Sequence, residues 1–325
     1  QRRQRRRHEI YRTLEQTTAN ANAQAQAWVE PALRAQLRDP RALRAAAWRR
    51  HGAWIAASLP DVAASMLDAL ATYVAVAREV PGIDLGTAVV PVYRQHPMAL
   101  AQQALTVSQL NEGRVVLGIG LSHPVVVESM WGLSYDRPLG YMREYLEALL
   151  PMLRGDASSV AGDAVVSHGS VDVAAPAPNV LIAALGPKML ELAAQVADGT
   201  VTWMVGPRTL ADHIVPSIGR AADGADRPRP RVVAGLPVCV TDDLGRARER
   251  AAEQFVMYGG LPSYRAMLDR EGADGPEDIA VIGSAEEVAD RLAAVSESGV
   301  TTIAASEFGD PDELAATRDV LVSLL

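Results

Sequence analysis

Gly186, Pro187 and Lys188 separate an apolar run from an amphipathic segment within AALGPKMLELAAQVADGTV, residues 183–201. Proline fixes φ and has no amide donor, so this step ends one element and places Pro187 at the first position of a helix. The first free amides of that helix point back toward the end of the preceding strand, where the helix dipole favours an anion. The spacing therefore predicts an anion-binding turn.

A second candidate group lies in GIGLSH, residues 118–123. Its two glycines stand inside a strand end, which suits a backbone that must approach a flat ligand closely. His123 stands where this strand meets its helix, with Ser122 beside it. This histidine is either a solvated loop residue, or a proton donor or hydrogen-bond partner to a bound ring. Trp203, at the end of another strand, is expected to form a pocket wall.

The sequence lacks the motifs of several other enzyme and metal-binding classes. The sequence has no HExxH, paired CxxC, GxSxG or Walker loop, so a metalloprotease, a zinc finger, an α/β-hydrolase and a P-loop hydrolase have no support, and no metal site is expected. His96, before Pro97 at a helix start, is interpreted as a helix cap rather than a catalyst. One helix start could bind an anion, and few charged side chains lie at the strand ends. Together these features indicate a cofactor that performs the chemistry itself.

The strands that must position these residues read as continuous apolar runs that alternate with amphipathic helices. This pattern is typical of a parallel sheet covered by helices, and an eighth strand would complete a (β/α)8 TIM barrel, the fold that we predict. The missing strand should be the first, and its one candidate is AQAWVEP, residues 25–31. A doubly wound open sheet is the alternative. The seven predicted strands lie near residues 53–59, 83–90, 115–121, 180–185, 200–204, 231–240 and 300–305.

The composition and net charge of the chain indicate in which cellular compartment it is expected and which classes of partner it is expected to bind. The chain has 325 residues, 49% of them apolar, and no apolar run approaches the roughly 20 residues of a membrane span. Residues 1–50 hold 12 arginines against four acids, yet the whole chain carries a net charge of −8, so its acidic body argues against nucleic-acid binding. With a single cysteine, Cys239, and no start typical of a secretory leader, a cytoplasmic protein is expected.

Two parts of unequal size are predicted along the chain. Residues 1–30 form a basic and polar N-terminal segment, and residues 31–325 form one barrel domain. The cluster QRRQRRRHE reads either as an arm that touches nucleic acid or anionic lipid, or as a frayed or extended end, which is the interpretation we favour.

Four stretches of the sequence resemble the luciferase-like monooxygenase family, and most closely its F420-dependent oxidoreductase branch. The resemblance runs in order over about residues 53–305 and implies a (β/α)8 barrel that holds a flavin or deazaflavin at its C-terminal mouth. The stretches are IDLGTAVVPVYRQHPMALAQQALTV, GRVVLGIGLSH, RPLGYMREYLEALLPMLRG and VLIAALGPKMLELAAQVADGTVTWM.

The same resemblance implies which residues contact the cofactor. A cis peptide bond between Ala88 and Val89 would support the tricyclic ring from behind, and His123 falls where some relatives carry an acid near the substrate. Lys188 is either a counter-charge to the phosphate or a solvated helix lysine. Ser58 and Asp61 are catalytic candidates by position alone. The ring would be lined by Gly120, Leu121 and Ser122, and the phosphate would be received by Ala184, Leu185, Gly186, Pro187, Lys188 and Met189.

The function expected from this resemblance is hydride transfer between coenzyme F420 and a small organic substrate. An FMN-dependent luciferase-like monooxygenase is the first alternative, and a flavin- or deazaflavin-binding protein without turnover is the second. No membrane partner is expected. Many family members form dimers, which makes a homodimer a candidate assembly, although the sequence shows no apolar patch that a partner must cover. Substrate choice is expected to depend on the loops after the strands, above all residues 155–179.

Overall fold

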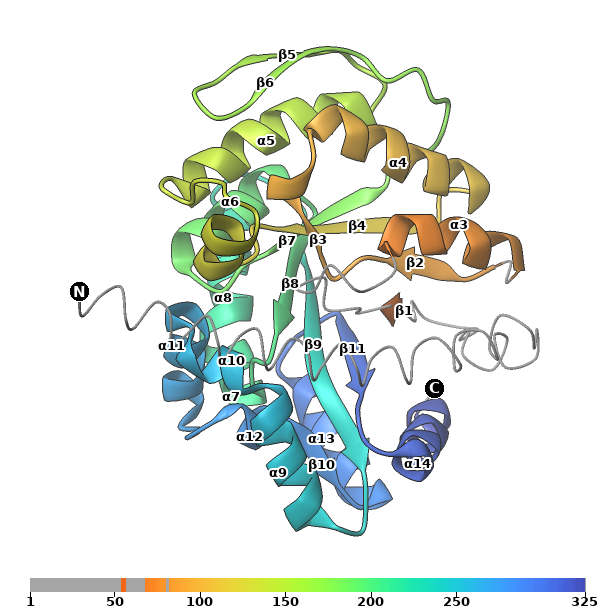
Figure 1. Cartoon of the computed structure of the whole chain (residues 1–325), viewed down its shortest axis with the longest axis vertical. Coiled ribbons are helices and arrows are strands. Elements are labelled where there is room, and N and C mark those ends of the chain that lie inside the picture. The colour runs from red at the N-terminus through yellow and green to blue at the C-terminus, as the bar shows by residue number, and fades with distance from the viewer. Residues whose placement is uncertain (1–53, 57–67, 80–81, 325) are drawn as a thin grey trace.

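The computed structural model describes residues 54–56, 68–79 and 82–324. Its central sheet is parallel and follows the order β1–β2–β4–β7–β8–β9, with β3 beside β4 and with β10 and β11 both beside β9. β1 also lies next to β11, so the sheet curls toward itself (Figure 1). The strands of this sheet are β1 (Trp54–Ala56), β2 (Asp84–Gly86), β3 (Val90–Pro91), β4 (Val115–Gly120), β7 (Asn179–Ala183), β8 (Gly199–Trp203), β9 (Arg231–Val240), β10 (Val281–Gly283) and β11 (Thr302–Glu307).

The curled parallel sheet confirms the predicted barrel-type fold and all seven predicted strands. The expected first strand at residues 25–31 lies outside the described residues. β10 was not predicted, because three residues that follow a short helix carry too little pattern to be separated from their surroundings.

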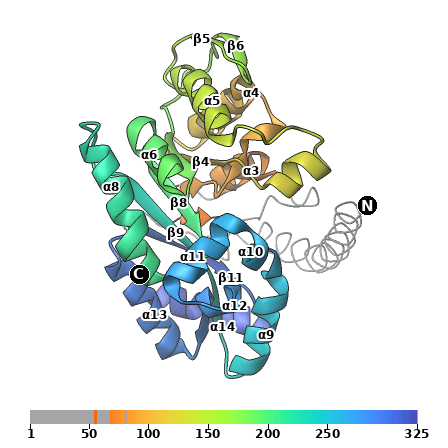
Figure 2. The same ribbon diagram turned by 90° about the vertical axis from the view of Figure 1, so that its left-hand side faces the viewer.

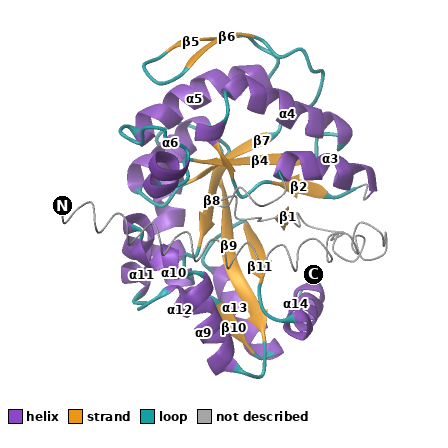
Figure 3. Cartoon of the chain, viewed as in Figure 1, coloured by secondary structure: helices purple, strands orange, loops and turns teal. Residues whose placement is uncertain are grey.

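Helices surround the sheet, as Figure 3 shows. Local sequence sets where several of them begin. Pro97 starts α4, and His96 caps it by accepting the amide of Met98 on Nδ1 at 3.2 Å, which confirms the predicted cap. The helices are α3 (Ala69–Glu79), α4 (Pro97–Leu110), α5 (Pro138–Leu153), α6 (Pro187–Val196), α7 (Pro207–Thr209), α8 (Val215–Asp223), α9 (Leu244–Gln254), α10 (Val256–Gly260), α11 (Pro262–Glu271), α12 (Pro276–Ile279), α13 (Ala285–Glu297) and α14 (Pro311–Ser323), with the 3₁₀ turn η1 (Val92–Arg94) and the π-helical turns η2 (Val125–Met130) and η3 (Leu210–Ile214).

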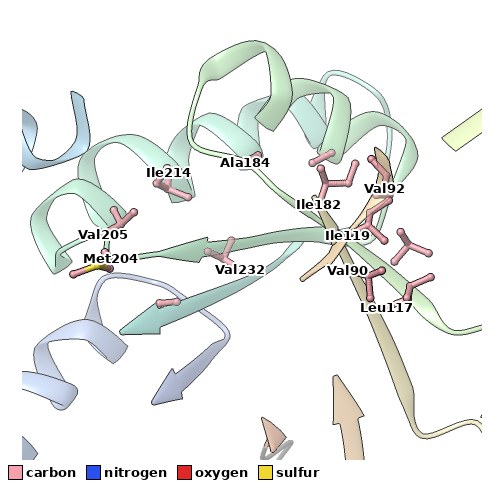
Figure 4. Close-up of a cluster of buried hydrophobic side chains, with 14 of the residues drawn as sticks. Val90, Val92, Leu117, Ile119, Ile182, Ala184, Met204, Val205, Ile214 and Val232 are labelled. Carbon is pink, nitrogen blue, oxygen red and sulfur yellow. The ribbon is translucent and has the colours of Figure 1, made fainter. Parts of the chain in front are cut away.

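Two apolar layers flank the sheet because successive side chains of a strand point to opposite faces. The outer layer lies between the sheet and the helices (Figure 4) and includes Leu117, Ile119, Ile182 and Val232. The alternate positions of the same strands form a separate, inner cluster. Its buried members are Val116, Leu181, Val201, Val233 and Ala304, against which the half-buried Ala88, Val89 and Ala183 pack. Small side chains therefore end the inner layer at the carboxyl ends of the strands.

The segment 155–179, predicted to be a loop, contains a two-stranded antiparallel hairpin, β5 (Ser158–Ala161) and β6 (Val166–Gly169). His96 Nε2 donates to the Val166 carbonyl at 2.8 Å and so attaches the hairpin to the start of α4. The alternation of apolar and polar residues is short here, and the contact with His96 spans 70 positions, so the sequence pattern alone missed this element. No helix in the described part of the chain is long and apolar enough to cross a membrane.

Candidate functional site

The floor of the candidate site begins at a close approach between β4 and the segment after β2. The Thr87 amide donates to the Val116 carbonyl at 3.1 Å, and its hydroxyl donates to the Gly118 carbonyl at 2.7 Å. A Cβ on Gly118 would lie 2.0 Å from the Thr87 carbonyl oxygen. Only glycine allows this approach. It brings the following peptide bond, Ala88–Val89, against the end of β4, and this bond is cis, as the resemblance implied.

Gly120 extends this floor toward the next strand. A Cβ at Gly120 would lie 2.7 Å from Val89 Cγ2 and 3.2 Å from the Ala183 Cβ, so the three residues meet with no room for a larger one. Ala88, Val89 and Ala183 are half-buried, and Gly120 is buried. The result is a small, apolar surface at the carboxyl ends of β4 and β7, of the kind that a flat ring can approach closely.

Beyond this floor the chain turns at Leu121 and Ser122, both half-buried, into His123. Ser122 adopts a left-handed conformation, with φ of 62°, and its carbonyl accepts the Tyr135 hydroxyl at 3.3 Å. Burial lowers the pKa of His123 to about 4. The imidazole is therefore neutral at pH 7, which favours the predicted role of hydrogen-bond partner over that of a cationic acid.

His123 belongs to a set of rings that crosses the carboxyl ends of the strands, which we call the aromatic arc. His123 follows β4, Trp203 ends β8, and Phe308 follows β11, whereas Phe255, Tyr258 and Tyr264 come from the segment after β9. Figure 2 shows α10 and α11, which carry the two tyrosines, in front of β9 and β11. The centroid distances are 5.8 Å for His123–Tyr264, 6.2 Å for His123–Tyr258, 4.9 Å for Tyr258–Tyr264, 6.2 Å for Trp203–Tyr258, 6.1 Å for Trp203–Phe255 and 5.6 Å for Phe255–Phe308.

Sequence reasoning found two members of the arc, His123 and Trp203, and missed the rest. One signal was present: aromatic residues are only 5% of the chain, yet both of its phenylalanines and two tyrosines belong to this set. Tyr258 and Tyr264 sit on helices, where their spacing alone reads as ordinary helix packing, and Phe255 and Phe308 are single aromatic residues in the segments between elements.

The predicted anion turn is open to solvent. Gly186 is the N-cap of α6 with extended backbone, φ −84° and ψ 151°, no side chain caps the helix, and a Cβ at Gly186 would meet nothing within 4 Å. Gly186, Pro187 and Lys188 are exposed, whereas Ala184 is buried and Leu185 and Met189 are half-buried. Because Pro187 has no amide hydrogen, the amides of Gly186 and Lys188 are the ones that can face an anion.

The amides at the start of α7, the helix after β8, already bind a carboxylate of the protein itself. The Glu271 carboxylate on α11 accepts the amides of Arg208 at 3.2 Å and Thr209 at 2.7 Å. It lies so close that a Cβ at Gly206 would be 2.3 Å from the Glu271 Cδ. This turn is thus closed to an external phosphate, and the start of α6 is the open one of the two.

The remaining predicted residues are placed as follows. Ser58 and Asp61 lie outside the described residues. In the part of the chain that the structure describes, no group of three or more histidine, cysteine or acidic side chains is arranged to hold a metal ion.

The fold and this site correspond to a known class of proteins. The family model for luciferase-like monooxygenases matches residues 45–302, and the chain belongs to the luciferase-like monooxygenase family. This match confirms the prediction that the chain belongs to an oxidoreductase family.

Two sequence relatives are named enzymes. The chain is 29% identical over 265 residues to a 5,10-methylenetetrahydromethanopterin reductase of Methanolobus tindarius, covering 79% of each chain. It is 26% identical over 255 residues to an F420-dependent glucose-6-phosphate dehydrogenase of Amycolatopsis mediterranei, covering 76% of this chain and 72% of that protein.

Solved structures share the fold at lower identity. The coenzyme F420-dependent tetrahydromethanopterin reductase of Methanopyrus kandleri superposes with a TM-score of 0.66 at 21% identity, covering 80% of this chain and 87% of that one. An FMN complex of the oxygenating constituent of 3,6-diketocamphane monooxygenase, from a plasmid of Pseudomonas putida, superposes with a TM-score of 0.62 at 17% identity, covering 83% and 86%.

The burial of His123 predicts an acid-dependent loss of stability. Its folded pKa, about 4, lies below the unfolded value of 6.5, so the unfolded chain binds more protons between these pH values. The contribution is fully present above pH 6.5 and is lost as the pH falls toward 4, by about 3 kcal/mol in total. We expect His123→Gln to lose less stability than the parent between pH 7 and pH 4.5 in urea unfolding. The matched control, His168→Gln at an exposed position, should follow the parent curve.

Proposed function

We propose that this protein is an F420-dependent oxidoreductase that transfers a hydride between the deazaflavin and a small organic substrate. The observation that carries the proposal is the placement of a flat apolar floor beside an open helix start. β4 and β7 are paired, with Ile119 opposite Ile182, so Gly120 reaches Ala183, and Gly186 follows three residues later. A ring on the floor and a phosphate at α6 would therefore be held by two neighbouring strands.

The chain's own groups have separate roles in this proposal. Gly120, Val89 and Ala183 would form the surface behind the ring, and the absence of larger side chains at their junction keeps that surface flat. The amides at the start of α6 would bind the phosphate, assisted by the helix dipole. When bound, the deazaflavin supplies the hydride chemistry. His123, neutral in the folded protein, would hydrogen-bond to the substrate or to the ring rather than attract an anion.

The F420 assignment is supported by the F420-dependent glucose-6-phosphate dehydrogenase at 26% identity. The relative at 29% identity is a 5,10-methylenetetrahydromethanopterin reductase, and the structure of a tetrahydromethanopterin reductase that shares this fold is described as coenzyme F420-dependent. FMN is the alternative, supported by the fold neighbour that holds it and by the family to which the chain belongs. Both cofactors join a flat tricyclic ring to a phosphate, so the floor and the α6 start fit either of them.

A binding titration of the full chain against F420 and against FMN, followed by fluorescence, tests the assignment. Tighter binding of F420 supports the proposal, and binding of FMN alone would put the monooxygenase alternative first. If neither bound, the cofactor assignment would be wrong. Turnover of a panel of enones, alcohols and imines by the loaded protein then separates an enzyme from a protein that only retains the cofactor.

A further inference from the structure

Helix α11, in the segment after β9, has one apolar and aromatic face and one charged face. On α11, the Tyr264 ring lies 5.8 Å from the His123 ring, edge to face, and Met267 and Leu268 are buried in the core. The charged side chains of Arg265, Asp269 and Glu271 on the same helix are bonded elsewhere. Arg265 donates to Asp269 Oδ1 at 2.7 Å and to the carbonyls of Asp274 at 2.8 Å and Ala273 at 2.6 Å. The face of α11 that meets the arc is thus the uncharged one.

The same segment is fixed in position at its far end. Glu271 accepts the two amides at the start of α7, and the Arg208 guanidinium donates to the Arg270 carbonyl. These bonds join α11 to the turn after β8, the strand that supplies Trp203. Tyr264 is therefore presented to His123 from a supported helix rather than from a free loop.

The polar groups of the arc are all neutral at pH 7. Burial raises the pKa of Tyr258 to about 12 and raises that of Tyr264 as well, and it lowers the pKa of His123. The Tyr264 hydroxyl thus stays a hydrogen-bond donor. In the described part of the chain it has no hydrogen-bond partner, whereas the Tyr135 hydroxyl is bound to the Ser122 carbonyl. Among the described residues, the cation–ring contact found is that of Arg94 with Trp131, which lies outside the arc.

We propose that the half-buried rings of the aromatic arc, those of Trp203, Tyr258 and Tyr264, form the substrate-binding surface and that this surface selects uncharged, planar carbonyl compounds, with the Tyr264 hydroxyl donating a hydrogen bond to the carbonyl oxygen. The flat faces and edges of Tyr258, Tyr264 and Trp203 favour a planar ligand by ring packing. An anionic substrate would have to give up its hydration without gaining a counter-charge from the arc. This inference rests on the proposed function for the reaction, but the surface and its selectivity can be tested without the cofactor.

The test compares two ligands that share a ring and differ in charge, 2-cyclohexen-1-one and 1-cyclohexene-1-carboxylate. Binding to the full chain is measured by saturation-transfer difference NMR, with and without F420. We expect the ketone to bind at least tenfold more tightly than the carboxylate. Tyr264→Phe, which keeps the ring and removes the hydroxyl, should weaken ketone binding about fivefold, as expected for one lost hydrogen bond. Tyr264→Ala should weaken it further.

The matched control is Tyr141→Phe, a half-buried tyrosine that stacks on Tyr93 outside the arc, and it should bind the ketone as the parent does. Equal binding of ketone and carboxylate, or no effect of Tyr264→Phe on ketone binding, would overturn the inference. Failure of the proposed function looks different: F420 would not bind, while the ketone would still bind and still respond to Tyr264→Phe.

Discussion

Gly186→Asp is expected to lower the affinity for F420 at least about 100-fold, a change of roughly 3 kcal/mol at 1.4 kcal/mol for each factor of ten. Aspartate is a favourable N-cap, so its carboxylate would accept the amides at the start of α6 and occupy the place proposed for the phosphate. The new charge would also repel the phosphate. Because the same cap stabilises the helix, the variant should remain folded.

Gly186→Ala separates the effect of charge from that of size. A Cβ at this position meets nothing within 4 Å, and φ of −84° suits any residue, so alanine should change the affinity less than about threefold. Fluorescence titration with F420 measures all three proteins, and circular dichroism checks their fold. If the aspartate variant bound F420 as the parent does, the phosphate would have to lie elsewhere.

Gly118→Ala is expected to destabilise the protein by at least about 3 kcal/mol, at the upper end for an overpacked core. The new Cβ would lie 2.0 Å from the Thr87 carbonyl oxygen. Thr87 has little room to retreat, because its amide and hydroxyl are both bonded to β4. A shift of Thr87 would also displace Ala88 and Val89, so cofactor affinity should fall as well.

Urea unfolding measures this loss, and Gly219→Ala provides the comparison. Gly219 lies within α8 with nothing within 4 Å of an added Cβ, so alanine there should stabilise the protein by about 0.5–1 kcal/mol through helix propensity. A Gly118→Ala protein within 0.5 kcal/mol of the parent would show that the close approach between Thr87 and β4 is not required.

The resemblance stated from four stretches of sequence led to the family, and the comparisons confirm it. The contacts proposed for Gly120 and Gly186 stay predictions until the titrations are done, although the structure gives both positions surroundings that suit a ring and a phosphate. The role of the N-terminal candidates Ser58 and Asp61 stays a prediction as well.

The helices and strands and their local boundaries could be predicted from the amino-acid sequence. Continuous apolar runs placed the strands, Pro187 and Pro97 placed helix starts, and His96 was correctly interpreted as a cap. These features depend on residues a few positions apart, because period, φ restriction and capping are properties of a short stretch of backbone.

Which of these elements share a site, and the protonation state of the side chains there, follow from the packing of the whole chain. It brought Tyr258 and Tyr264 to His123, more than 130 positions away, closed the helix start after β8 with Glu271, and left the start of α6 open. It also made His123 neutral, since burial and not residue type sets its pKa. Such contacts join segments distant in the chain, and burial is a property of the whole packed molecule, so no local pattern encodes either of them.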